Sequence, residues 1–164
     1  MSEELEEPLP TTSFDVINSR FLDAVTDDMY LEFTKEETDE MLDDLIVDAI
    51  TWFEYPKGKN LDDYNLEKRC FNCKLDNMEI NIIVKYMVSG WVSRQLAVID
   101  LIKQKYTGSD FKLTSQASHI KQLLNTKQEY EREGKHLQRM YSRRKKDENG
   151  IYVSDFGRIM EVNK

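Results

Sequence analysis

The chain has 164 residues, with 31 Asp and Glu against 23 Lys and Arg, and a formal net charge of −8 at pH 7. This length fits one domain with its own hydrophobic core. A charged third of the residues, with six Gly and three Pro, indicates a soluble, helix-rich protein. The acidic N-terminus has no apolar core segment, and no run of about 20 apolar residues occurs. We therefore expect no signal peptide, no membrane span and folding in a reducing cytosol.

Charge is divided unevenly along the chain. Residues 1–67 contain 20 acidic and 4 basic side chains, a net charge of −16, whereas residues 68–164 contain 11 acidic and 19 basic side chains, a net charge of +8. A bipolar chain of this kind fits head-to-tail packing between copies, because opposite charges of neighbouring copies attract each other. It also fits two solvated faces of different sign, and both interpretations stay open.

The N-terminal part combines an arm with a short helix. Residues 1–13 carry two of the three prolines and four glutamates, so we expect an acidic, flexible arm. Apolar residues then recur at helical spacing from Phe14 onwards, and Ser13 stands where an N-cap is needed. This pattern predicts a helix over residues 14–25.

A second helix begins at a capping box. Thr34 precedes Glu37 by three residues, a spacing at which each side chain accepts a hydrogen bond from the other residue's backbone N–H. An apolar stripe continues from there to about Phe53, and Pro56 ends the helix. The stretch from Tyr55 to Lys74 has no clear period and is expected to be a loop.

The longest apolar segment predicts a central helix at about residues 77–106, with Asp76 and Glu79 as its cap. Its apolar residues form two rows, and two rows imply burial on two sides. Only two other long amphipathic helices are available to cover it. A core helix enclosed on all sides within one bundle would explain both rows, and so would one row in the core with the other row against a neighbouring subunit, which is the interpretation that we favour. The residues predicted at the subunit interface are Val88, Val92, Leu96 and Ile99.

The last predicted helix begins near Thr114 or Ser115 and continues to about Lys145. Gly134 lies inside it and costs about 1 kcal/mol of helix stability relative to Ala. The basic residues at its end are favourable at a helix C-terminus. Residues 147–164 are expected to form an extended tail, which begins with a β-prone apolar segment too short to fold alone.

Together these elements predict a mainly α protein. The expected architecture is a bundle of three to four helices around the central buried helix, with extended N- and C-terminal arms. The helical domain is expected to span residues 14–146, between the acidic arm at 1–13 and the tail at 147–164.

No residue pattern indicates a metal or a cofactor. Cys70 and Cys73 form a lone CxxC, but a structural zinc site needs four ligands. The two histidines, His119 and His136, are 17 residues apart on one predicted helix, nearly five turns, and cannot converge on one ion. We interpret the cysteines as two ordinary buried thiols, and we expect a protein without enzymatic activity.

Two alternatives of other classes stay open. The acidic helix at 35–53 could hold magnesium in a helical nucleotide hydrolase, since its carboxylates recur at three-and-four spacing. The basic segment at 132–146 could contact phosphates in a small DNA-binding regulator. The residues singled out in that segment are Arg139, Arg143, Arg144, Lys145 and Lys146.

Three stretches carry a resemblance to a known family. They are Phe21–Thr34 (FLDAVTDDMYLEFT), Tyr106–Ile120 (YTGSDFKLTSQASHI) and Gln138–Lys145 (QRMYSRRK). With these stretches the chain resembles the head–tail connector proteins of tailed bacteriophages, also called adaptor or head-completion proteins. The similarity covers about residues 21–146, and its motifs are not catalytic signatures.

The resemblance implies a mostly helical subunit of the virion neck, made in the host cytoplasm. Such subunits assemble as a ring, typically of twelve copies, between the portal protein and the tail or stopper proteins, around the channel for genomic DNA. An acidic wall would suit that channel, because it repels phosphates. In such adaptors the C-terminal segment often reaches the portal. The residues predicted for that contact are Ile151, Tyr152, Val153 and Phe156.

Overall fold

The computed structural model describes residues 11–25, 34–54, 56–105, 113–146 and 152–154. It is mainly α-helical, as the sequence predicts. In chain order the elements are β1 (Thr12–Ser13), α1 (Phe14–Ala24), α2 (Lys35–Ile50), β2 (Tyr64–Asn65), β3 (Cys70–Phe71), α3 (Asn77–Lys105), α4 (Leu113–Arg143), β4 (Arg144–Lys146) and β5 (Tyr152–Ser154).

The predicted helix starts are confirmed by their hydrogen bonds. Ser13 caps α1 by accepting from the backbone N–H of Asp15. At α2, Thr34 and Glu37 form the complete capping box, and these hydrogen bonds lower the pKa of Glu37. At α3, the Asp76 carboxylate accepts from the N–H of Glu79 at 2.9 Å. Each cap uses residues close in sequence, which explains why the pattern reveals it.

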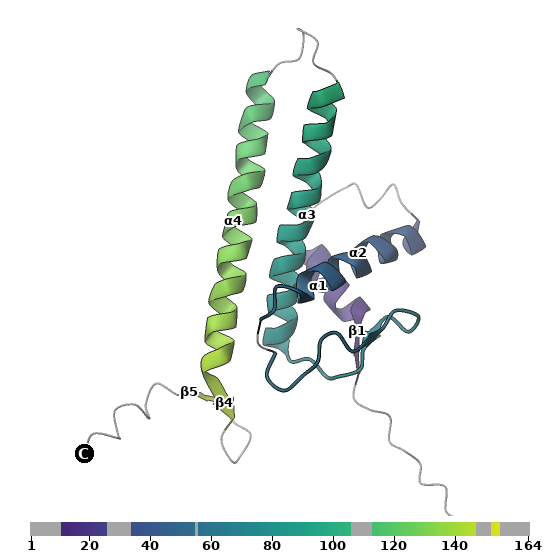
Figure 1. Cartoon of the computed structure of the whole chain (residues 1–164), viewed down its shortest axis with the longest axis vertical. Helices are drawn as coiled ribbons and strands as arrows, with labels where there is room; N and C mark the ends of the chain where they lie inside the picture. The colour runs from purple at the N-terminus through teal and green to yellow at the C-terminus, as the bar shows by residue number, and fades with distance from the viewer. Residues whose placement is uncertain (1–10, 26–33, 55, 106–112, 147–151, 155–164) are drawn as a thin grey trace, which may run out of the picture.

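Helix α3 is the central element, because it contacts each of the other three helices. Figure 1 shows α4 running alongside α3, while α2 extends from the other side of α3. Helices α1 and α2 pack against the N-terminal half of α3. Its core residues end at Val92. The remainder of α3 projects past α1 and α2 beside α4, so the molecule consists of a compact base and a long helical hairpin.

The base holds the hydrophobic core. Helix α1 contributes Phe14, Ile17 and Phe21 to it, all fully buried. The loop between α2 and α3 supplies Phe71 as well, which lies 5.0 Å from Phe14 between ring centroids. Residues of this loop thus cover apolar surface that the predicted helices alone would leave open.

Two small sheets lie within and beside this base. In the first, β3 is the middle strand, and both β1 and β2 pair with it antiparallel. The boundary of the predicted N-terminal arm is therefore wrong for Thr12 and Ser13. Thr12 is 8% exposed, and its hydroxyl accepts from the N–H of Leu75 at 2.8 Å. Residues 1–10 lie outside the described part of the chain.

Within the described residues, the Asn77–Leu101 part of α3 is long and apolar enough by length and composition to cross a membrane, with a mean hydropathy of 1.2 over 18 residues. In this structure 44% of those 18 residues are buried, and the core cluster accounts for the apolar residues of α3 up to Val92. The apolar composition therefore fits a central core helix.

Candidate functional site

The row of α3 residues predicted at a subunit interface is divided between the core and the surface. Val88 is 2% exposed and Val92 is fully buried, so both belong to the core of this chain. For these two residues the prediction is wrong, because helices of the same chain cover both sides of α3 at this level. Leu96 and Ile99 are half-buried, and their assignment to a neighbouring subunit stays a prediction.

Beyond Val92 the hairpin leaves the core. Among the residues of α3 whose burial the structure describes, none after Val92 is buried. Val98 is 52% exposed and Leu101 is 65% exposed, and their three-residue spacing places them on one face of α3. Leu124 of α4 is 44% exposed. We call residues 94–105 and 113–127 the distal hairpin.

The two helices of the hairpin are in close contact where they join the base. Gly134 of α4 lies against the ring of Tyr86, and a Cβ at Gly134 would stand 3.0 Å from Cζ of that ring. The side-chain amide of Gln138 donates to the hydroxyl of Tyr86 at 2.5 Å and to the carbonyl oxygen of Trp52 at 2.8 Å. Gln138 therefore ties the end of α2 to both helices, and the hairpin projects from the base with a defined direction.

A basic cavity lies at the opposite end of the hairpin, between the start of α3 and the end of α4. Its volume is about 810 Å³. The cationic residues that line it come from the loop after α2, from the residues just before α3 and from β4. They are Lys57, Lys59, Lys74, Arg144 and Lys145. We call this site the basic cavity.

The carboxylate of Glu79, in the wall of the basic cavity, is 1% exposed and fully engaged. It accepts from the ammonium of Lys59 and from the hydroxyl of Tyr141, both at 2.5 Å. It also accepts from the backbone N–H of Asp76 at 2.6 Å, which completes the cap of α3. Burial, and then the hydrogen bond to Glu79, raise the pKa of Tyr141, so its hydroxyl remains a donor.

The predicted basic segment is split between the helix and the strand. Helix α4 ends at Arg143, so the prediction of a helix to about Lys145 is wrong by two residues. Arg144 and Lys145 line the basic cavity, and Lys57 donates to the carbonyl oxygen of Arg144. Arg139 is exposed on α4 and lines a separate cavity of about 590 Å³. Lys146 lies in β4, and the structure does not describe its side chain.

Part of the predicted portal-binding tail folds back on its own chain. Tyr152 and Val153 lie in β5, which pairs antiparallel with β4, so that Tyr152 stands opposite Lys146. Val153 is 43% exposed. Ile151 and Phe156 lie outside the described residues. The contact of this segment with a portal protein stays a prediction.

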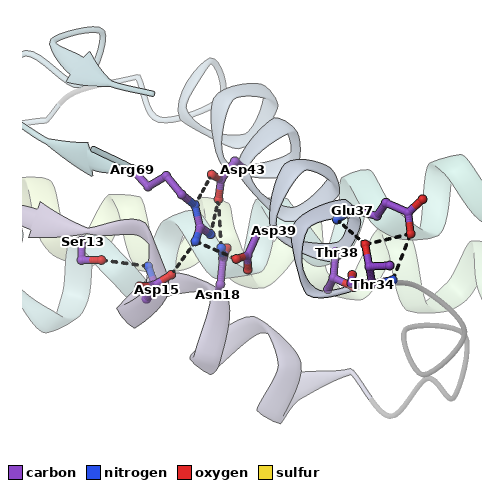
Figure 2. A network of polar contacts seen from close by, with 9 residues as sticks. All are labelled: Ser13, Asp15, Asn18, Thr34, Glu37, Thr38, Asp39, Asp43 and Arg69. Carbon is purple, nitrogen blue, oxygen red and sulfur yellow. Dashed lines mark hydrogen bonds and ion pairs between the residues drawn. The ribbon is translucent and has the colours of Figure 1, made fainter. Parts of the chain in front are cut away.

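Three carboxylates of α2, those of Asp39, Asp43 and Asp48, pair with arginines. Figure 2 shows Arg69 between α1 and α2, where its guanidinium contacts Asp43 at 2.6 Å, Asp39 at 2.9 Å and Asp15 at 3.0 Å. The hydrogen bond from Arg69 to Asp43 raises the pKa of Arg69. Asn18 also donates to Asp43, at 3.0 Å. These contacts, between residues 25 to 54 positions apart, fasten α1 and α2 to each other and to the residue before β3.

These ion pairs bear on the hydrolase alternative. Asp39 and Asp43 would have to exchange Arg69 for a metal, and Asp48 pairs with Arg94 at 2.8 Å. Within the described ranges, no group of three or more His, Cys, Asp or Glu side chains is placed to hold a metal ion. Cys70 and Cys73 are free and partly exposed, and burial raises the pKa of the Cys73 thiol.

The sequence reasoning missed the lysines of the basic cavity. Lys57, Lys59 and Lys74 are scattered over a loop without periodicity, so no local pattern marks them as neighbours of β4. The chain matches none of the family models, curated proteins or solved structures with which it was compared.

Proposed function

We propose that this protein is a non-enzymatic assembly subunit, a ring-forming connector of the neck of a tailed bacteriophage. The observation that supports a role in assembly is the set of exposed apolar side chains on the distal hairpin. Val98 and Leu101 share a face of α3 beyond the base, and no described part of the chain buries them. Apolar residues exposed on a projecting helix favour a protein contact.

The place of the assembly rests on the resemblance of three stretches to head–tail connectors. A mainly helical subunit with a projecting hairpin is compatible with that family. The ion pairs along α2 favour a structural role for several of its acidic residues over a metal site. The proposed partners are further copies of the chain, the portal protein, and tail or stopper proteins around the DNA channel.

Native mass spectrometry tests this proposal on the chain alone and mixed with the portal protein of the same virus. We expect multimers of the chain bound to portal rings in the mixed sample. The double variant Val98→Ser/Leu101→Ser should bind less, because it removes apolar area from the proposed contact. A matched control is Val16→Ser/Leu22→Ser on α1, which changes two exposed apolar residues of the base. A chain that stays monomeric in both samples would overturn the proposal.

A further inference from the structure

The basic cavity has an excess of positive charge. Five cationic residues line it, against the carboxylates of Asp76 and Glu79. Both carboxylates are engaged within the chain: Glu79 with Lys59 and Tyr141, and Asp76 with the first N–H groups of α3. Lys74 and Arg144 form no ion pair with a described residue, so the cavity retains positive charge on a protein whose net charge is −8. Such a site favours an anionic partner.

A stripe of carboxylates lies on the outer face of α2. Glu36, Glu40 and Asp44 recur every four residues, so they share one face of the helix. All three are exposed, and none has an ion-pair partner among the described residues. Their neighbours Asp39 and Asp43 instead point to Arg69 (Figure 2). We call Glu36, Glu40 and Asp44 the acidic stripe.

The acidic stripe and the basic cavity lie on different sides of the molecule. Helix α2 extends from α3 on the side away from α4, whereas the basic cavity lies at the end of α4 (Figure 1). A copy that binds one neighbour through its acidic stripe can therefore bind a second neighbour through its basic cavity. A contact between two different surfaces repeats from copy to copy, and it closes into a ring when the rotation allows.

We propose that the acidic stripe of one copy docks into the basic cavity of the next copy. This inference rests on the proposed ring and assigns its lateral contact. The proposed occupant is a second copy of this chain, because the chain itself carries the complementary charge. The acidic stripe lies away from the basic cavity of its own copy, so it can contact only the basic cavity of another copy. Nucleic acid phosphates are the competing occupant, and the test below distinguishes the two.

A charge-swap experiment tests the contact. Variant A carries Lys74→Glu and Arg144→Glu in the basic cavity, and variant B carries Glu40→Lys and Asp44→Lys in the acidic stripe. All four residues are exposed, and urea unfolding checks that each variant is folded. We expect each variant alone to self-associate at least about tenfold more weakly than the wild type, since like charges then face each other.

Mixing the two variants should restore assembly. The acidic stripe of A meets the unchanged basic cavity of B, and the basic stripe of B meets the acidic cavity of A. Native mass spectrometry, with portal protein present, should then show assemblies that contain A and B in equal numbers. A matched control is Lys68→Glu/Lys135→Glu, which changes the charge equally at two exposed residues outside the basic cavity and the distal hairpin and should assemble as the wild type does.

The outcomes separate the two proposals. If variant A alone or variant B alone forms rings as well as the wild type does, this contact is overturned and the connector function still stands. No self-association of the wild type, even with portal protein, would overturn both. Binding of a short DNA duplex that A loses, with self-association unchanged, would assign the cavity to phosphates and overturn the docking of a second copy.

Discussion

Tyr141 shows how a single residue links two helices through a buried charge. It is the only buried hydrophobic side chain of α4 among those described, and its hydroxyl donates to the carboxylate of Glu79 at 2.5 Å. Its ring also packs edge-on against Phe53 with centroids 5.5 Å apart. Without that donor, Glu79 would keep Lys59 as its charged partner, but its carboxylate, which is 1% exposed, would lose a short hydrogen bond.

The substitution Tyr141→Phe should therefore destabilise the protein by about 2 kcal/mol, the range for a hydrogen bond to a charged group. The effect should depend on pH. The raised pKa means that folded Tyr141 keeps its proton at a pH where the unfolded chain loses it, above about 10. The contribution of Tyr141 to the free energy of unfolding is therefore fully present below about pH 10 and is lost as the pH rises further. Urea unfolding of both proteins at pH 8 to 11 measures this decline, which should be smaller for Tyr141→Phe. Equal declines would contradict the assignment.

At the scale of elements, the hairpin depends on close approach of α3 and α4. Gly134 looks unfavourable in a helix, but its missing side chain leaves room for the ring of Tyr86. Lys85 and Glu133 form an ion pair at 2.6 Å beside this contact, and Ser89 donates to Glu131 at 3.1 Å. Gly134 thus lowers the helix propensity of α4 but allows α3 and α4 to pack closely together.

The substitution Gly134→Ala should reduce stability by about 1 kcal/mol. A gain of about 1 kcal/mol in helix propensity is outweighed by overpacking against Tyr86, which costs roughly 1–3 kcal/mol. In a Tyr86→Ala background the ring is gone, so the same change should be neutral or stabilising. Urea unfolding of all four proteins forms a double-mutant cycle. A stabilising Gly134→Ala in the wild-type background would show that the two helices do not need this close contact.

At the scale of the whole molecule, α3 has two environments. Its first half is enclosed by the base and by α4, and its second half projects with exposed apolar residues. The same helix therefore serves folding at one end and, in our proposal, assembly at the other. Stability and association should then respond to different substitutions along it.

Comparison of Val92→Ala with Leu101→Ala checks this division. Val92 is fully buried, so its truncation should cost about 1–3 kcal/mol of unfolding free energy. Leu101 is 65% exposed, and its truncation should change the unfolding free energy by less than about 0.5 kcal/mol while weakening association. Unfolding and sedimentation of both variants measure the two effects. An equal loss of stability in both would contradict the division.

The mainly α class, the starts of α1, α2 and α3, and the two-sided burial of α3 could all be predicted from the amino-acid sequence. Caps and apolar periodicity involve residues one to four positions apart, so they are legible in one stretch of chain. Which residues cover α3 depends on segments far away in sequence, and for this reason part of the predicted subunit interface was wrong. The assignment of Val88 and Val92 to a neighbour was wrong, because both are buried in the core of this chain.

Only the tertiary structure brought together Arg69 with Asp39 and Asp43, and the lysines of the loop with β4. These groups have no common period, because ion pairs between distant segments form wherever packing of the core happens to place them. Packing also decided that the apolar surface of α3 is left open along the distal hairpin and closed at Val92. Helices form through hydrogen bonds between residues close in sequence, so the sequence pattern reveals them. The surface that stays exposed for partners depends on packing between segments far apart in sequence, so the sequence pattern does not reveal it.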